Sequence, residues 1–294
     1  MNLRKKMRRG SLAALIALAL SSSALAMPTG GVVQSGDVNI GGSTDFSIVA
    51  SGATIGATTD SAIDWNTFNI ANGETLNFNI ADGKLLLNQV TGAQASDILG
   101  TMRQTGGGEI ALVNPNGIHI GGTASFDVSN LTLSTLNMDT AEFNRLKGQG
   151  EWALKQGAQG AKELRVDTGA QFNIHNGGSL ALMASRVTVA DGVTFVADSA
   201  EHGGLYIYAY KENTEGGTKR SLETEAGNTI DFRGKVSGVE YLEMNASSVH
   251  LEGAELAGKD IFICSIAKGQ GEIDTTNHLD HQKYTMTAAP ANTL

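Results

Sequence analysis

The sequence is poor in residues that cross-link or stiffen a chain. Its 294 residues include one cysteine, Cys264, and three prolines. A single cysteine excludes an intramolecular disulfide, so the fold must depend on its buried core. Cys264 ends the apolar run at residues 261–264, and we interpret it as a packing residue rather than a reactive thiol.

Basic residues are scarce as well. Lys and Arg number 21 against 30 Asp and Glu, and five of the basic residues lie within the first nine positions. Beyond residue 26 the chain therefore carries 16 basic and 30 acidic residues. Nucleic acids and anionic membranes are bound by basic patches, so this balance argues against both as partners.

The chain also lacks clustered catalytic or metal-binding residues. Its acidic residues are scattered, without the paired carboxylates that polysaccharide-active β-helix enzymes need. His278 and His281 have the spacing of a metal-binding pair, but they lie in a polar tail without further ligands. We predict that the chain is not an enzyme and has no cofactor and no metal site. A secreted polysaccharide-active enzyme is the alternative of a different class.

The first 26 residues have the composition of an export signal. A basic segment precedes a nine-residue apolar core at 12–20, and Ala24-Leu25-Ala26 follows. The apolar run is shorter than the roughly 20 residues that span a bilayer, which favours a signal peptide over a membrane anchor. We predict export by the Sec machinery and cleavage between Ala26 and Met27, with residues 1–26 removed.

What the chain has instead is glycine and short alternating runs. Gly accounts for 37 residues, while aromatic residues make up only 5%. Alternating apolar and polar positions, as at residues 76–80 and 187–189, are separated by Asn-Gly or Asp-Gly pairs. This pattern of alternating runs and turn dipeptides predicts an all-β protein of short strands and tight turns. An antiparallel sandwich or barrel and a parallel β-helix both fit it.

The second half of the sequence favours the β-helix. Taken as anchors, Val187, Ile207, Ile230, Val249 and Ile273 follow one another at steps of 20, 23, 19 and 24 residues. Steps near 20 residues are about the length of one solenoid coil. Residues 139–163 lack alternation and are predicted to be an excursion from the solenoid, with room for a short helix. Residues 211–220 are predicted to be an exposed loop, and 275–294 a polar, frayed tail.

One turn between two predicted strands is unusually well specified. In Asn114-Pro115-Asn116-Gly117 each residue has the identity that its position in a type I turn favours. Pro115 fixes its own φ, and Gly117 can adopt a positive φ where the chain enters the next strand at Ile118. A stiff corner of the fold is therefore sufficient to explain the turn, although a partner could also read it.

This turn is one of five sequence blocks that follow one another in a fixed order. They are Trp65-Asn66-Thr67-Phe68-Asn69-Ile70 with Gly73, Asn88-Gln89-Val90-Thr91-Gly92, Ser96-Asp97-Ile98-Leu99-Gly100, Asn114-Pro115-Asn116-Gly117-Ile118 and Leu131-Thr132-Leu133-Ser134-Thr135. Together they resemble the secretion domain of two-partner secretion (TpsA-type) exoproteins, the filamentous-haemagglutinin-like N-terminal domain (haemagglutination activity domain). Two positions depart from the pattern: Gln89, where the family usually has Arg, and Leu133, where it usually has Ala.

The resemblance implies a fold and a route of export. The fold is a right-handed parallel β-helix, a single-stranded solenoid, with the secretion domain at residues 27–200 and further coils at 201–274. The implied partner is an outer-membrane β-barrel transporter with POTRA domains, reached through the periplasm. The exoprotein would then act at the cell surface in adhesion or haemagglutination, on a host receptor or glycan. A truncated secretion-domain fragment without an effector stalk is the alternative.

Overall fold

A computed structural model describes residues 27–138, 143, 152–156, 160, 162–199, 202–216, 219–265 and 269–274. The predicted signal peptide at residues 1–26 lies outside these residues. So do His278, His281 and the polar tail predicted at 275–294. Within the described residues, no helix has the length and apolarity needed to cross a membrane.

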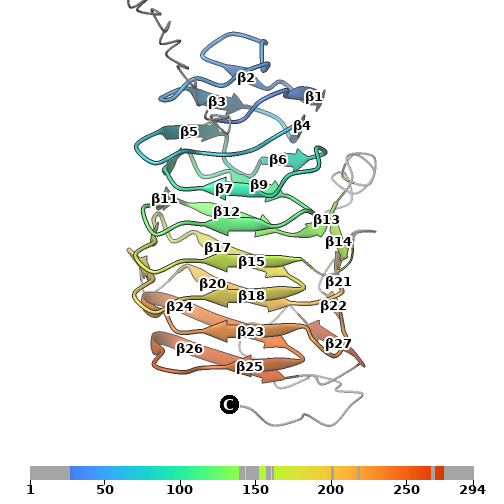
Figure 1. Cartoon of the computed structure of the whole chain (residues 1–294), viewed down its shortest axis with the longest axis vertical. Coiled ribbons are helices and arrows are strands. Elements are labelled where there is room, and N and C mark those ends of the chain that lie inside the picture. The colour runs from blue at the N-terminus through green and yellow to red at the C-terminus, as the bar shows by residue number, and fades with distance from the viewer. Residues whose placement is uncertain are drawn as a thin grey trace, which may run out of the picture.

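Three stacks of parallel strands form the faces of a β-helix (Figure 1). The first face consists of β3 (Thr54–Ala57), β5 (Thr75–Ile80), β8 (Thr101–Thr105), β11 (Ser125–Val128), β16 (Gln171–Ile174) and β19 (Thr194–Ala197). The second consists of β4 (Ser61–Trp65), β6 (Leu85–Val90), β9 (Glu109–Val113), β12 (Asn130–Ser134), β17 (Ser179–Ala184) and β20 (Gly204–Ala209). The third consists of β7 (Ser96–Ile98), β10 (Ile118–Ile120), β15 (Glu163–Val166), β18 (Arg186–Val189), β23 (Thr229–Phe232) and β25 (Ser248–His250).

Two long strands close the stack at its C-terminal end. β24 (Lys235–Ala246) pairs with β19 through its first residues and with β20 through its last, so it spans the first and second faces. β26 (Glu255–Ser265) pairs with β24 along most of its length. The successive parallel pairings confirm the predicted parallel β-helix and exclude the antiparallel sandwich.

Alternation along each strand sorts the side chains between the inside and the outside of the helix. In β5, Leu76, Phe78 and Ile80 are buried, whereas Asn77 and Asn79 occupy the outward positions between them. Because side chains in a strand alternate between its two faces, the apolar positions of every coil meet in one continuous core.

A column of phenylalanine rings fills the middle of this core. Phe126, Phe172 and Phe195 are register partners in three successive coils. Their ring centroids are 4.5 and 4.6 Å apart, and their planes differ by 9° and 13°. These distances follow the spacing of about 4.8 Å between neighbouring strands, so identical side chains stack ring on ring.

A short cap covers the N-terminal end of the helix. β1 (Val32–Ser35) pairs with β4, and β2 (Asn39–Ile40) pairs with β3, both antiparallel. Phe46 from the cap lies edge-on to Trp65 at a centroid distance of 6.0 Å. The cap therefore shields the first coil from water and occupies the edges of β3 and β4 that further coils would otherwise pair.

Segments that leave the helix after strands of the second face form an antiparallel sheet beside it, which we call the side sheet (Figure 1). It contains β13 (Leu136–Asn137), β14 (Trp152–Gln156), β21 (Glu212–Gly216), β22 (Lys219–Thr224) and β27 (Gly269–Asp274). Leu136, Phe143 and Leu154 pack with Val113 and Met183, which point outward from the second face. The second face is thus buried on both sides.

The side sheet confirms one prediction and corrects two others. The excursion predicted at 139–163 is present: β14 lies in the side sheet, and Phe143 is helical and buried. The exposed loop predicted at 211–220 is wrong, because β21 and β22 form a hairpin there and pair with β14 and β27.

The predicted anchors are the second correction. Val187, Ile230 and Val249 are indeed register partners on the third face, but Ile207 lies on the second face and Ile273 in the side sheet. A hairpin leaves the helix between Val187 and Ile230, so this coil is much longer than the one that ends at Val249. Coil length is regular only where no excursion intervenes.

Candidate functional site

The sequence blocks that marked the secretion domain meet at one corner of the helix. In each of the first coils the chain turns there from the second face to the third. Residues 65–70, 90–96, 113–118 and 133–135 occupy this corner in successive coils, and we call the set the motif corner. Blocks separated by about one coil in the sequence therefore lie on top of one another.

Trp65 and Asn88 form the buried base of the motif corner. Both side chains have 0% exposure. The Trp65 indole Nε1 donates to Asn88 Oδ1 at 3.1 Å, and Asn88 Nδ2 donates to the Ala111 carbonyl at 3.3 Å. A buried indole N–H and a buried carboxamide each need partners, and here they satisfy one another across three coils.

The Asn114 side chain binds the turn to the preceding coil. Its Nδ2 donates to the Gln94 carbonyl at 3.0 Å and to Ser96 Oγ at 2.9 Å. Its Oδ1 accepts from both the backbone N–H and the Nδ2 of Asn116, each at 3.0 Å. Asn114 is fully buried, so all of its hydrogen-bonding capacity is used inside the fold.

Asn116 forms a second link to the neighbouring coil, and Gly117 closes the turn. Asn116 Nδ2 donates to the Gly92 carbonyl of the preceding coil at 2.8 Å. The Gly117 N–H donates to the Asn114 carbonyl at 3.1 Å, which closes the turn, and Gly117 has a φ of 121°. The positive φ explains the glycine, because a side chain there would be strained.

Gly92 is required by a close contact rather than by its backbone angles. A Cβ built on Gly92 would lie 2.0 Å from the backbone carbonyl oxygen of Asn66 in the preceding coil. Backbone atoms cannot yield as a flexible side chain can, so only glycine allows these two coils to approach at the corner.

The other predicted motif positions serve the core or the turns. Buried side chains are contributed by Phe68, Ile70, Val90, Ser96, Ile98, Ser134 and Thr135. Gly73 lies in a turn with a φ of 82°, and Gly100 packs against the carbonyl of Ala71. Of the two departures, Leu133 is a core residue, and Gln89 donates from Nε2 to Asn137 Oδ1 at 2.9 Å.

One buried residue that supports the first coils was missed from the sequence. Gln104 points into the core, where its Oε1 accepts from the N–H groups of Ser129 and Asn130 at 3.0 and 3.1 Å. It thereby holds the bend between β11 and β12. The alternation of β8 places residue 104 on the inward face with Met102, and a polar residue at an inward position is the signal that could have identified it.

A second polar cluster lies outside, on the third face. His119 Nδ1 is 2.9 Å from Asp97 Oδ1, and His119 Nε2 is 2.9 Å from Asp167 Oδ2. Arg165 Nε donates to the other oxygen of Asp167 at 2.7 Å. Burial lowers the pKa of His119, but the hydrogen bonds to Asp167 and Asp97 outweigh it, so the pKa lies above its usual value.

This cluster predicts a pH-dependent stability. Because the pKa of His119 is raised by folding, its ionised form stabilises the folded state. This stabilisation is fully present when the pH is below the pKa of 6.5 in the unfolded chain, and it is lost as the pH rises through the pKa in the folded chain. We expect His119→Gln to cost on the order of 0.5–1 kcal/mol at about pH 5.5 and less at about pH 8.5, because the pair is partly exposed. Urea unfolding at both pH values measures this.

His202→Gln is the matched control for this measurement. The His202 side chain is 79% exposed and lies 3.9 Å from its nearest carboxylate oxygen, on Glu240. It should therefore show little dependence on pH. An equal cost of His119→Gln at both pH values would show that the ion pairs with Asp97 and Asp167 do not stabilise the fold.

Nothing in the described part of the chain gathers three His, Cys, Asp or Glu side chains in a geometry suited to a metal ion. Cys264 is partly buried in β26, and burial raises the pKa of its thiol. A raised pKa keeps the thiol protonated and unreactive near neutral pH.

Comparison with known proteins gives a consistent result. A family model described as the TPS secretion domain matches residues 24–293. The heme/hemopexin-binding protein of Haemophilus influenzae (strain Rd) is 31% identical over 125 residues, which make up 42% of this chain and 13% of that protein. The chain thus spans only a small part of this curated relative.

One solved structure shows a related fold. The HMW1 secretion domain from Haemophilus influenzae matches with a TM-score of 0.62 at 19% identity, over 82% of this chain and 60% of that one. The filamentous hemagglutinin secretion domain matches with a TM-score of 0.34 at 13% identity, over 81% of this chain and 96% of that one. The likeness to the HMW1 domain supports the same β-helical architecture.

Proposed function

The chain belongs to the TPS secretion domain family, and from this we propose that it is an exoprotein that a dedicated two-partner transporter exports across the outer membrane. The family match over residues 24–293 is the observation that carries the proposal. Under this proposal the Sec machinery delivers the chain to the periplasm, and a signal peptidase cleaves between Ala26 and Met27. An outer-membrane β-barrel with POTRA domains then captures residues 27–200, and residues 201–274 follow as further coils.

The chemistry of the chain supports passage through a narrow pore. With one cysteine it forms no intramolecular cross-link that would block an extended chain. Each coil of the folded helix contacts the coils beside it, so the protein can fold one coil at a time as it emerges. Burial of apolar surface at each step would favour outward movement.

Export is tested by expressing the full chain with and without its two-partner transporter in a Gram-negative host. We expect the mature chain in the medium only when the transporter is present, and in the periplasm when it is absent. Immunoblots of both fractions measure this, and N-terminal sequencing should begin at Met27. Equal amounts in the medium without the transporter would refute the proposal, and a secreted chain that begins at Met1 would refute the cleavage.

At the cell surface we propose a role in adhesion. The support for it is the resemblance to filamentous-haemagglutinin-like domains, together with a fold that presents long, regular outer faces. Agglutination of erythrocytes and binding to epithelial cells by the purified mature chain test this role separately from export. A chain that is exported but does neither would favour the alternative of a secretion domain without an effector stalk.

A further inference from the structure

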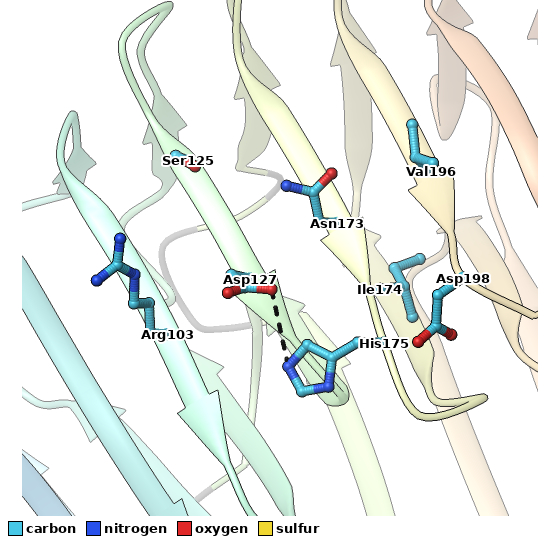
Figure 2. Close-up of a pocket in the computed structure, with 8 residues that line it drawn as sticks. All are labelled: Arg103, Ser125, Asp127, Asn173, Ile174, His175, Val196 and Asp198. Atoms are coloured by element: carbon cyan, nitrogen blue, oxygen red, sulfur yellow. Dashed lines mark ion pairs between the residues drawn. The ribbon is translucent and has the colours of Figure 1, made fainter.

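A hollow on the outside of the first face is lined by polar side chains from four successive coils. It measures about 400 Å³, and its lining includes Arg103, Asp127, Asn173, His175, Val196 and Asp198 (Figure 2). The backbone register fixes this arrangement, because β8, β11, β16 and β19 place residues 103, 127, 173 and 196 side by side. Neighbouring strands of this face are about 4.8 Å apart.

Several hydrogen-bonding groups in the hollow are unused. Among the described residues, the side chains of Arg103 and Asn173 have no hydrogen-bond partner. Asp127 Oδ1 and His175 Nε2 form a long ion pair at 3.9 Å (Figure 2), a distance too great for a hydrogen bond. The ion pairs of the third face are shorter: His119 lies 2.9 Å from Asp97 and from Asp167, and Arg165 lies 2.7 Å from Asp167.

Two of the lining groups are held in place by the turn after β16. The Asn176 amide nitrogen lies 2.8 Å from His175 Nδ1. Since the amide nitrogen can only donate, Nδ1 accepts, and the neutral imidazole carries its proton on Nε2, the atom on the side of Asp127. Asp198 accepts from the backbone N–H groups of Asn176 and Gly177 at 3.0 and 3.4 Å, which fixes its orientation.

The composition of the hollow excludes several kinds of ligand. One guanidinium faces two carboxylates, so a polyanion would be repelled and a lone metal ion would find no cluster of ligands. The apolar part is limited to Val196 and the buried Ile174, which is too little for a hydrophobic ligand. Donors and acceptors that alternate along a shallow hollow suit a ligand with many hydroxyl groups.

We propose that this hollow binds a neutral oligosaccharide that lies along the helix axis. The spacing of about 4.8 Å between neighbouring strands is close to the length that one hexose adds to an extended glycan. Arg103 and the His175 Nε2–H would donate to hydroxyl oxygens, Asp127 would accept from hydroxyl groups, and the Asn173 amide can do both. The inference deepens the adhesive role proposed above by giving it a place and a ligand class.

The test uses the fluorescently labelled mature chain on a panel of immobilised glycans. The panel holds neutral oligosaccharides, including lacto-N-neotetraose and cellotetraose, and sialyllactose as the acidic comparison. We expect binding to at least one neutral glycan, and a loss of about ten-fold or more in affinity for Asp127→Ala and for Asn173→Ala. Gln171→Ala is the matched control, because Gln171 is the preceding outward position of β16 and does not line the hollow.

Three results would overturn the proposal. These are no binding to any neutral glycan, binding to sialyllactose alone, and neutral-glycan binding that Asp127→Ala and Asn173→Ala leave unchanged. Both side chains are exposed, so the variants should retain the melting temperature of the wild type, and equal melting curves establish that a loss of binding is local. Export of the same variants into the medium is measured in parallel, so a failure of glycan binding is distinguishable from a failure of export.

Discussion

Phe172→Ala is expected to lower the free energy of unfolding by about 3–5 kcal/mol, the range for removing a buried aromatic ring. The Phe172 side chain has 0% exposure and is stacked between Phe126 and Phe195 at centroid distances of 4.5 and 4.6 Å. Its loss leaves a cavity in the centre of the core and breaks two stacking contacts. Urea unfolding of the purified mature chain, followed by circular dichroism, measures the change.

Ile48→Ala is the matched control for this loss. Ile48 is 68% exposed in the N-terminal cap, so the same kind of truncation removes little buried surface. Its effect should stay within about 0.5 kcal/mol. A cost below about 1 kcal/mol for Phe172→Ala would mean that the neighbouring coils collapse into the cavity and that the phenylalanine column is not a main source of stability.

The same variant bears on how the chain crosses the outer membrane. If each folded coil helps to draw the next one outward, Phe172→Ala should slow the appearance of the chain in the medium when the transporter is present. Ile48→Ala should be secreted at the rate of the wild type. Unchanged secretion of a clearly destabilised Phe172→Ala chain would count against folding as the driving force.

The sequence was sufficient for individual strands but not for their arrangement. Alternation at residues 76–80 is a local property, and β5 follows it position by position. Whether such strands close into a sandwich or wind into a helix depends on which strands pair, and neighbouring positions contain no information about pairing. The steps near 20 residues favoured a helix and the family resemblance specified it, and the parallel register of β5 with β8 confirms it.

The same limit applies to the candidate sites. Each block of the motif corner was recognisable, but its contacts were not, because Asn116 reaches Gly92 and Asn114 reaches Ser96 only when one coil is laid on the next. His119 and Asp167 are 48 residues apart in sequence, with the excursion between them, so no spacing rule predicts their ion pair. Excursions of unequal length conceal the period on which such a rule would depend.

Asn114→Ala is expected to cost about 2–4 kcal/mol of unfolding free energy, because several buried hydrogen bonds are lost together. The substitution removes both donors to Gln94 and Ser96 and the acceptor for Asn116, and it leaves these groups unpaired beside a fully buried position. Thermal and urea unfolding of the mature chain measure the cost. A loss of less than about 1 kcal/mol in the free energy of unfolding would show that water replaces these partners and that the turn contributes little to the contact between coils.

Asn66→Ala and Pro115→Ala separate a structural corner from one that the transporter contacts. Asn66 is exposed and its side chain has no hydrogen-bond partner among the described residues, and Pro115 is half-buried. We expect both variants to keep nearly wild-type stability. If the motif corner serves only the fold, secretion should follow stability: strongly reduced for Asn114→Ala and normal for the two surface variants. If the transporter contacts the corner, the Asn66→Ala or the Pro115→Ala chain should remain in the periplasm although it folds normally. The buried Asn114 would then act indirectly, by shaping the surface that the transporter recognises.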